Sequence, residues 1–214
     1  MESVSNVGVL DKGVGIVQAL ARGPLDLAGL QRATSLPRAT AHRLALALEA
    51  HHLVRRDAQG RFCLGFELIR LGRAAADQFP LAELATPPLV ELRDATGESV
   101  QLFVREHDAR RCVVSLQSSH ALQWLVPVGA LLPLDRGSAG AVLAGRAPVN
   151  LHESVEEREP GVASVSAPVR DREGVVVAAV SVSGPVERLT RSPGTRFGGA
   201  VLSAAEQVSS ALAR

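Results

Sequence analysis

The sequence predicts an α+β protein made of two parts. In the first part, apolar residues recur at helical spacing up to about residue 51, and two short strands around a glycine-containing turn follow. In the second part, after residue 98, β-branched and alternating segments predominate until a final amphipathic helix. Helices with one hairpin, followed by antiparallel strands with helices at the ends, indicate two α+β units.

Length and composition suit one large or two small globular domains. The chain has 214 residues, of which 46% are hydrophobic and 21% charged, with a formal net charge of +1. No stretch approaches the roughly 18 to 20 apolar residues of a membrane span, and the N-terminus lacks a basic segment followed by an apolar one. We therefore expect a cytoplasmic protein with no membrane contact. The two cysteines, Cys63 and Cys112, are far apart and form no CxxC, so neither a disulfide framework nor a cysteine zinc site is expected.

The front part is expected to begin with two helices. Residues 10–20 place apolar side chains at helical spacing, and Gly23-Pro24 ends that helix. Asp26 stands at the N-cap position of a short second helix over residues 27–34.

A third helix is predicted from Pro37 to about His51. Proline suits the first helical position because its missing N–H would be unpaired there anyway. One face is expected to be buried by its apolar residues, namely Ala41, Leu44, Ala45 and Leu48. The other face and the helix start are then left with polar residues, namely Arg38, Thr40, His42 and Arg43.

Two strands, 53–56 and 61–64, are predicted around the turn at residues 57–60. Three helices followed by a β-hairpin form a winged helix-turn-helix, which we place at residues 1–65. A helix about 10 to 12 Å across fits the DNA major groove, while the hairpin can contact the adjacent backbone. The candidate DNA-binding residues are Arg38, Thr40, His42 and Arg43 on the helix, and Arg56 and Arg61 on the wing.

Positive charge is concentrated in this front part. Residues 32–61 contain six arginines against Glu49 and Asp57 only, a local net charge of +4. Such a basic patch can attract the phosphate groups of DNA. The alternative is an ordinary solvated charged surface.

A linker helix is expected over residues 66–79, because apolar residues at 64, 68, 71 and 75 form a helical stripe. The second domain then covers residues 80–214. The elements expected in it are a helix over 81–95 interrupted by Pro87-Pro88 and capped by Gly97, strands at 99–105, 111–116 and 122–126, a helix from Ser138, a hairpin of 161–170 with 175–183, and a final helix over 195–212.

The order and spacing of several blocks resemble the IclR family of bacterial transcription regulators over nearly the whole chain. These blocks are Val9-Leu10-Asp11-Lys12, residues 36–44 and 60–65, Thr96-Gly97-Glu98-Ser99, Val126-Pro127-Val128-Gly129, Gly137-Ser138-Ala139-Gly140, Glu159-Pro160-Gly161-Val162, Ala167-Pro168-Val169 and residues 178–185. Within the family the chain is most similar to an actinobacterial group linked to amino-acid metabolism, leucine biosynthesis in particular.

The resemblance implies a GAF-like effector domain at residues 80–214 that binds a small metabolite. It also implies homodimers that can pair into homotetramers, and repression or activation at double-stranded operator DNA. Separately, the lack of cofactor motifs and of a set of metal ligands predicts no cofactor and no metal. The effector-binding positions that the resemblance implies are Gly129, Ala130, Leu131, Ser138, Ala139, Ser181 and Ser183. Glycines, a helix N-terminus and serines suit a pocket chemically, although strand serines can simply pair with their neighbours.

One departure from the family lies between Gly145 and Glu159, where roughly two dozen residues are missing. Either this is a natural deletion that opens one wall of the pocket, or the sequence given joins two parts of a longer chain. The second interpretation is favoured because residues 150–162 resume the family register.

Other classes of function are weaker. There is no GxSxG, HExxH, Walker loop or GxGxxG after a strand, and the adjacent residues His51-His52 and His152-Glu153 have no third ligand at a helpful spacing, so an enzyme is not expected. A metabolite-sensing module that acts through protein partners without specific DNA binding remains the alternative. A redox switch at Cys63 is weighed against a buried inert thiol, which is favoured.

Overall fold

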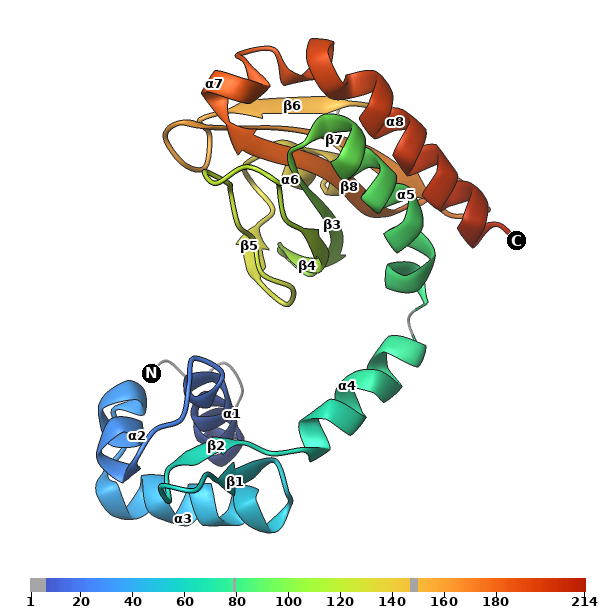
Figure 1. Ribbon diagram of the computed structural model, residues 1–214. Helices are drawn as coiled ribbons and strands as arrows, with labels where there is room; N and C mark the ends of the chain where they lie inside the picture. The colour runs from blue at the N-terminus through green and yellow to red at the C-terminus, as the bar shows by residue number, and fades with distance from the viewer. Residues whose placement is uncertain (1–6, 79, 147–149) are drawn as a thin grey trace. The chain divides into compact units, whose positions relative to one another are not determined.

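The computed structural model describes residues 7–78, 80–146 and 150–214 (Figure 1). The chain divides into two compact units, Met1–Phe79 and Pro80–Arg214. Each unit has its own hydrophobic core, and each is described by itself below.

The first unit contains three helices, a hairpin and a fourth helix. Their bounds are α1 Gly8–Leu20, α2 Leu27–Thr34, α3 Arg38–Ala50, β1 Val54–Arg56, β2 Phe62–Leu64 and α4 Glu67–Asp77. The Asp26 carboxylate accepts a hydrogen bond of 2.7 Å from the Gly29 N–H, so the predicted N-cap of α2 is confirmed. Pro37 precedes α3 as its N-cap instead of occupying the first helical position.

Apolar side chains from all three front helices and the hairpin form one core. The buried members are Ile16, Leu20, Leu30, Leu36, Ala41, Ala45, Val54 and Phe62. Leu44 and Leu48 pack against them, so the predicted buried face of α3 is confirmed. Strands β1 and β2 pair antiparallel from Val54 opposite Leu64 to Arg56 opposite Phe62.

The second unit combines a sheet with helices at both ends of the sequence. Its elements are α5 Leu81–Thr96, β3 Ser99–Glu106, β4 Ala109–Leu116, β5 Leu131–Pro133, α6 Ser138–Leu143, β6 His152–Val155, β7 Val162–Arg170, β8 Val176–Pro185, α7 Val186–Leu189 and α8 Pro193–Leu212. The six strands form one antiparallel sheet in the order β5-β4-β3-β8-β7-β6. The predicted α+β class is therefore confirmed.

The two faces of this sheet differ in chemistry because side chains alternate along each strand. On one face, Val165 of β7 and Val180 of β8 belong to a large apolar cluster with residues of α5 and α8, and these two helices cover that face in Figure 1. On the other face lies α6, whose residues Ala139, Val142 and Leu143 join a smaller cluster. The serines of β7 and β8 share this second face.

Two expectations for the second unit were wrong. Residues 122–126 do not form a strand, because the edge of β4 is already paired with β5 and the loop before it. The Cys112 N–H donates to the Ala130 carbonyl, and the Gly129 N–H donates to the Cys112 carbonyl. Pro87 and Pro88 do not interrupt α5, which runs through both to Thr96. Gly97 caps this helix as expected, in the left-handed conformation with φ of 72°. Strands β5 and β6 and helix α7 had not been predicted.

Candidate functional site

The exposed face of α3 is polar and basic. Its buried positions are Ala41 and Ala45, so Arg38, His42 and Arg43 point away from the core and are exposed, while Thr40 is half-buried. Within the described part of the chain no hydrogen bond or ion pair engages the side chains of Arg38 and Arg43. Both guanidinium groups therefore keep all their donors available for an anionic partner.

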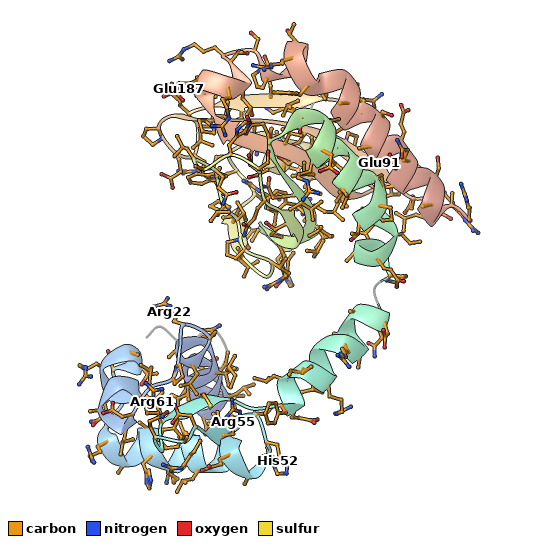
Figure 2. The ribbon with its side chains drawn as sticks, in the orientation of Figure 1. Arg22, His52, Arg55, Arg61, Glu91 and Glu187 are labelled. Carbon is orange, nitrogen blue, oxygen red and sulfur yellow. The ribbon has the colours of Figure 1, made fainter. Side chains whose placement is uncertain are left out.

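The hairpin carries three more arginines, of which Arg55 and Arg61 are labelled in Figure 2. Arg61 forms an ion pair of 2.7 Å with Asp57, and Arg56 lies 3.4 Å from Glu49 and 4.2 Å above the Phe62 ring. These two candidate wing contacts are thus partly neutralised by neighbouring carboxylates. Phosphate must compete with Asp57 for Arg61.

The turn of the hairpin is held by the Asp57 carboxylate. One oxygen accepts hydrogen bonds from the N–H groups of Gln59 at 3.0 Å and Arg61 at 2.9 Å. Partial burial alone would raise the pKa of Asp57, but the hydrogen bonds from Arg61 and Gln59 and the charge of Arg61 outweigh it and leave the pKa below its usual value. The carboxylate form therefore maintains the wing.

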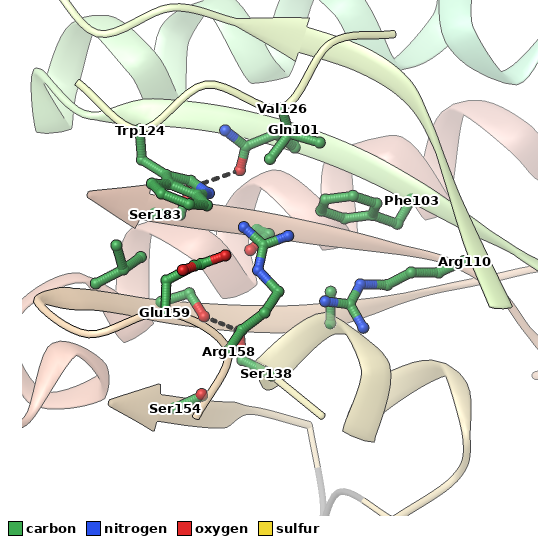
Figure 3. A pocket seen from close by; sticks show the side chains of 15 residues that line it. Gln101, Phe103, Arg110, Trp124, Val126, Ser138, Ser154, Arg158, Glu159 and Ser183 are labelled. Carbon is green, nitrogen blue, oxygen red and sulfur yellow. Dashed lines mark hydrogen bonds between the residues drawn. The ribbon is translucent and has the colours of Figure 1, made fainter. Parts of the chain in front are cut away.

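In the second unit a cavity lies on the α6 side of the sheet (Figure 3). Its volume is about 40 Å³, so the space accommodates only a small ligand. Its apolar lining consists of Phe103, Trp124, Val126, Ala139 and Val162. Its charged residues are Arg110, Arg158 and Glu159.

Five serines and one glutamine supply the neutral polar lining. The serines are Ser138, Ser154, Ser164, Ser181 and Ser183. The Ser138 hydroxyl lies 2.7 Å from those of Ser164 and Ser166, which connects the start of α6 to β7. The Ser183 hydroxyl donates to Oε1 of Gln101 at 2.8 Å. Nε2 of Gln101 is buried and has no hydrogen-bond partner among the described residues.

Arg110 forms one wall of the cavity and is only 3% exposed. Its Nη1 donates to the carbonyls of Pro133 and, at 2.8 Å, of Arg136, so the guanidinium holds the connection between β5 and α6. Its Nε has no partner among the described residues. Burial, with the nearby charge of Arg158, lowers the pKa of Arg110 to about 10, which leaves it charged at neutral pH.

The loop between β6 and β7 brings Arg158 to the cavity. The Arg158 guanidinium lies 4.8 Å from the centroid of the Trp124 ring, and burial lowers the pKa of this arginine. Glu157, the residue before it, accepts a hydrogen bond of 2.8 Å from the Gly137 N–H at the start of α6. This N–H is therefore already paired within the chain and is not available to a ligand.

The structure brings together only part of the predicted effector site. Ser138, Ala139, Ser181 and Ser183 line the cavity. Residues 129–131 do not line it, because they continue into β5 and pair with the outer edge of β4. Gly129 and Leu131 are exposed there, and Ala130 packs against the smaller apolar cluster.

Six polar residues of the cavity had not been predicted, namely Gln101, Arg110, Ser154, Arg158, Glu159 and Ser164. The sequence could have indicated Arg110. Buried and less buried positions alternate along β4, and Arg110 falls on a buried position like Cys112, where a charge is costly. Gln101 likewise interrupts an apolar strand between Val100 and Leu102. No comparable signal exists for Arg158, because only the folding of its loop across the sheet brings it to the cavity.

The described residues show no group of three or more histidine, cysteine or acidic side chains able to hold a metal. Across 7–78, 80–146 and 150–214, no helix combines the length and the apolar character that crossing a membrane requires. Cys63 and Cys112 are both buried free thiols, and burial raises the pKa of Cys112 to about 11.

Comparisons with known proteins extend over both units. The IclR helix-turn-helix domain matches residues 9–58, and the C-terminal domain of the bacterial transcriptional regulator IclR matches residues 73–155 and 152–210. The glycerol operon regulatory protein of Streptomyces coelicolor is 29% identical over 87% of this chain and 88% of its own length. The transcriptional repressor IclR of Escherichia coli is 24% identical over 96% of this chain and 90% of its own length.

Among solved structures, HmgR of Pseudomonas aeruginosa is similar with a TM-score of 0.75 and 28% identity, over 97% of this chain and 100% of that one. The alignment with the Escherichia coli repressor spans 247 positions, more than the 214 residues of this chain, so that relative has residues that this chain lacks. The two C-terminal matches meet at residues 152–155, close to the short segment noted above. Part of that segment, residues 147–149, lies outside the described residues.

These relatives are transcriptional regulators and not enzymes. The two family matches together cover most of the chain, in the same order as its two structural units. The chain therefore belongs to the IclR family of bacterial transcriptional regulators.

Proposed function

We propose that a small metabolite, bound in the cavity of the second unit, modulates the affinity of the first unit for operator DNA. The observation that carries this proposal is the coexistence of two separate sites. One is the exposed basic face of α3, and the other is a small, partly closed cavity with unsatisfied polar groups. A ligand shifts such an equilibrium only through its different affinities for two arrangements of the protein.

On the DNA side, we assign base-edge contacts to Arg38 and Thr40 at the start of α3, and base or phosphate contacts to His42 and Arg43 one turn later. Arg56 and Arg61 of the hairpin are assigned to phosphate. The exposure of α3 and its free guanidinium groups support the first set. The ion pairs of the wing arginines make their contribution smaller than that of α3.

We propose that the chain acts as a homodimer or a homotetramer. Two apolar surfaces of the first unit support this. In α1, Val9 and Leu10 are 60% and 58% exposed, and no residue of α4, which is described along its whole length, is buried. Exposed apolar stripes of this kind are typical of surfaces that pair with a second copy. Two α3 helices about 34 Å apart, or a multiple of this spacing, would then match two operator half-sites.

The target genes are proposed from the resemblance stated above, which indicates control of amino-acid biosynthesis, leucine biosynthesis in particular. The relatives carry different names, including a glycerol operon regulator and IclR itself. The candidate effector residues remain those that line the cavity, Ser138, Ala139, Ser181 and Ser183.

The test is binding of the full chain to the DNA upstream of its own gene and to a leucine-biosynthesis promoter, across a salt series. Phosphate contacts release counterions, so the proposal predicts tight binding whose affinity falls steeply with salt. Absence of specific binding to either DNA, or retention that is insensitive to salt, would favour the alternative of a sensor that acts through protein partners.

A further inference from the structure

Two hairpin turns of the chain share a sequence pattern and a set of hydrogen bonds. The turn of the wing, the β1–β2 hairpin, covers residues 56–61, and the turn between β7 and β8 covers residues 170–175. Both begin Arg-Asp and have glycine at the fifth position. In each turn the Asp N–H donates to the carbonyl four residues later, the Gly N–H donates to the Asp carbonyl, and the first arginine donates to the Gly carbonyl. The turn at 170–175 is therefore an internal reference for the wing.

One carboxylate oxygen completes each turn. Oδ1 of the aspartate accepts hydrogen bonds from the N–H groups two and four residues later. The distances are 3.0 and 2.9 Å for Asp57 and 3.1 and 2.8 Å for Asp171. Such side-chain to backbone bonds are what an aspartate contributes to a turn. The turn itself therefore makes no use of Oδ2.

The two turns differ at their last position, which is Arg61 in the wing and Val175 in the reference turn. Nε of Arg61, a residue labelled in Figure 2, donates to Oδ2 of Asp57 at 2.8 Å, and its Nη2 lies 2.7 Å from the same oxygen. Val175 has no polar side-chain atom to offer Asp171. In the wing alone, the second carboxylate oxygen thus binds a guanidinium group.

The ion pair leaves the outer edge of the Arg61 guanidinium open. Nε and one N–H of Nη2 face Asp57, so three of the five N–H donors remain. No other hydrogen bond or ion pair involves this side chain in the part of the chain that the structure describes. The Arg61 side chain is 46% exposed, against 16% for Asp57. A phosphate that competes with Asp57 for this charge can still reach the Nη1–Nη2 edge while the ion pair stays in place.

This arrangement has two physical consequences for DNA binding. An arginine loses much rotamer freedom when it binds a partner, and Asp57 has already restricted that freedom in the free protein. DNA of any sequence attracts unpaired positive charge, and Asp57 offsets the charge of Arg61 at the end of the wing. A restrained and neutralised arginine adds little to a duplex that does not place a phosphate at its open edge.

Resting on the proposed contact between Arg61 and DNA phosphate, we infer that Asp57 is a positioning residue that determines specificity through Arg61. It holds the guanidinium in one orientation and offsets its charge. The wing then strengthens binding to a duplex that fits it and contributes little to binding of other DNA. The hydrogen bonds of Oδ1 alone would make Asp57 a turn residue like Asp171.

The test replaces Asp57 by asparagine, which keeps an oxygen for the turn and puts an NH₂ group in place of Oδ2. Anisotropy across a salt series measures binding of the full chain to a random-sequence duplex and to a duplex that the wild type selects from a random pool. In Asp57→Asn the affinity for the random duplex is expected to rise about fivefold, the effect of one charge pair in water. Its salt slope should steepen by about one, because one more arginine is free for phosphate.

The affinity of Asp57→Asn for the selected duplex is expected to change less than its affinity for the random one, so discrimination between the two falls. Asp171→Asn, which removes the same charge from the reference turn, is the matched control and should change neither affinity. An equal loss of affinity for both duplexes in Asp57→Asn would show that Asp57 only maintains the turn, and would overturn the inference.

A double-mutant cycle separates positioning from charge alone. In the Arg61→Ala background, Asp57→Asn should leave the affinity for the random duplex nearly unchanged, because the arginine that it would release is absent. The same fivefold rise in both backgrounds would show that Asp57 acts only by its charge on the DNA, and would overturn the inference.

The inference and the proposed function can fail separately. If Arg61→Ala weakens DNA binding but Asp57→Asn changes neither affinity nor salt slope, the proposed phosphate contact stands and the inference fails. If Arg61→Ala leaves binding of both duplexes unchanged, the proposed contact itself fails. If the cycle behaves as expected but no metabolite shifts operator affinity, the inference stands and the proposed regulation fails.

Discussion

The Arg158 guanidinium stacks on Trp124, with its central carbon 4.8 Å from the ring centroid. This distance lies within the range of a cation–π interaction. Trp124 is the single tryptophan of the chain, so its indole is the main fluorescent group of the protein. A ligand that engages Arg158 therefore changes the environment of the one group whose fluorescence dominates the protein.

The free arginines of α3 are expected to dominate DNA affinity. Arg38→Ala and Arg43→Ala should each weaken operator binding about tenfold or more, because each removes a guanidinium that has no partner among the residues the structure describes. Fluorescence anisotropy at fixed salt measures the change, and Arg172→Ala is the control with unchanged affinity. The ligand response of Trp124 should persist in both variants. Loss of both activities together would indicate misfolding and contradict the separation of the two sites.

The wing should depend on pH through Asp57. Its pKa is lowered in the folded protein, so the stabilisation it gives the turn is fully present above its unfolded pKa, roughly 4, and is lost as the pH falls through the lower folded value. The amide resonances of Gln59 and Arg61 should therefore titrate together below pH about 4. In Asp57→Asn this shared titration should disappear. Titration of those amides near neutral pH would contradict the account.

The buried ion pair between Glu98 and Arg188 should contribute strongly to the stability of the second unit. Glu98 is 3% exposed and accepts hydrogen bonds of 2.6 and 2.9 Å from Arg188, which also donates to the Leu122 carbonyl. Arg188→Ala is expected to lower the free energy of unfolding by about 3 kcal/mol, since Glu98 is left buried without its partner. Urea unfolding of the full chain measures this. A loss below about 1 kcal/mol would match an ordinary surface pair and contradict the assignment.

Two glycines should respond oppositely to alanine. At Gly140 a Cβ would meet Arg110 Nη1 at 2.5 Å and the Leu134 carbonyl at 2.7 Å, so Gly140→Ala should destabilise the protein by about 2 kcal/mol. At Gly199, within α8, a Cβ meets nothing within 4 Å, so Gly199→Ala should stabilise by about 0.5 to 1 kcal/mol. The same urea measurement compares them. Equal changes in the free energy of unfolding for Gly140→Ala and Gly199→Ala would show that α6 does not crowd Arg110.

Local signals in the sequence were sufficient for the first unit. The N-cap at Asp26, the apolar spacing in α3 and the glycine turn of the hairpin each determine structure over a few residues, and each prediction holds within about two residues at its ends. The exposed positions of α3 followed from the same helical periodicity.

The cavity was only partly predictable because it depends on tertiary contacts. Ser181 and Ser183 reach it through strand alternation, which the sequence shows directly. Residues 122–126 have strand-like composition but form a loop beside the cavity, since β5 already occupies the edge of β4. Arg158 reaches the cavity only because Glu157 ties its loop to Gly137, 20 positions earlier in the chain.

The most direct test of the central claim is operator affinity of the full chain with and without a small metabolite that changes Trp124 fluorescence, measured by anisotropy at fixed salt in the wild type and in Arg158→Met, a variant of a residue that lines the cavity. The proposed function predicts that this metabolite shifts the operator affinity of the wild type. Arg158→Met is expected to bind the operator normally but to need more metabolite for the same shift. An operator affinity that stays constant while the cavity is saturated would contradict the coupling of the two units.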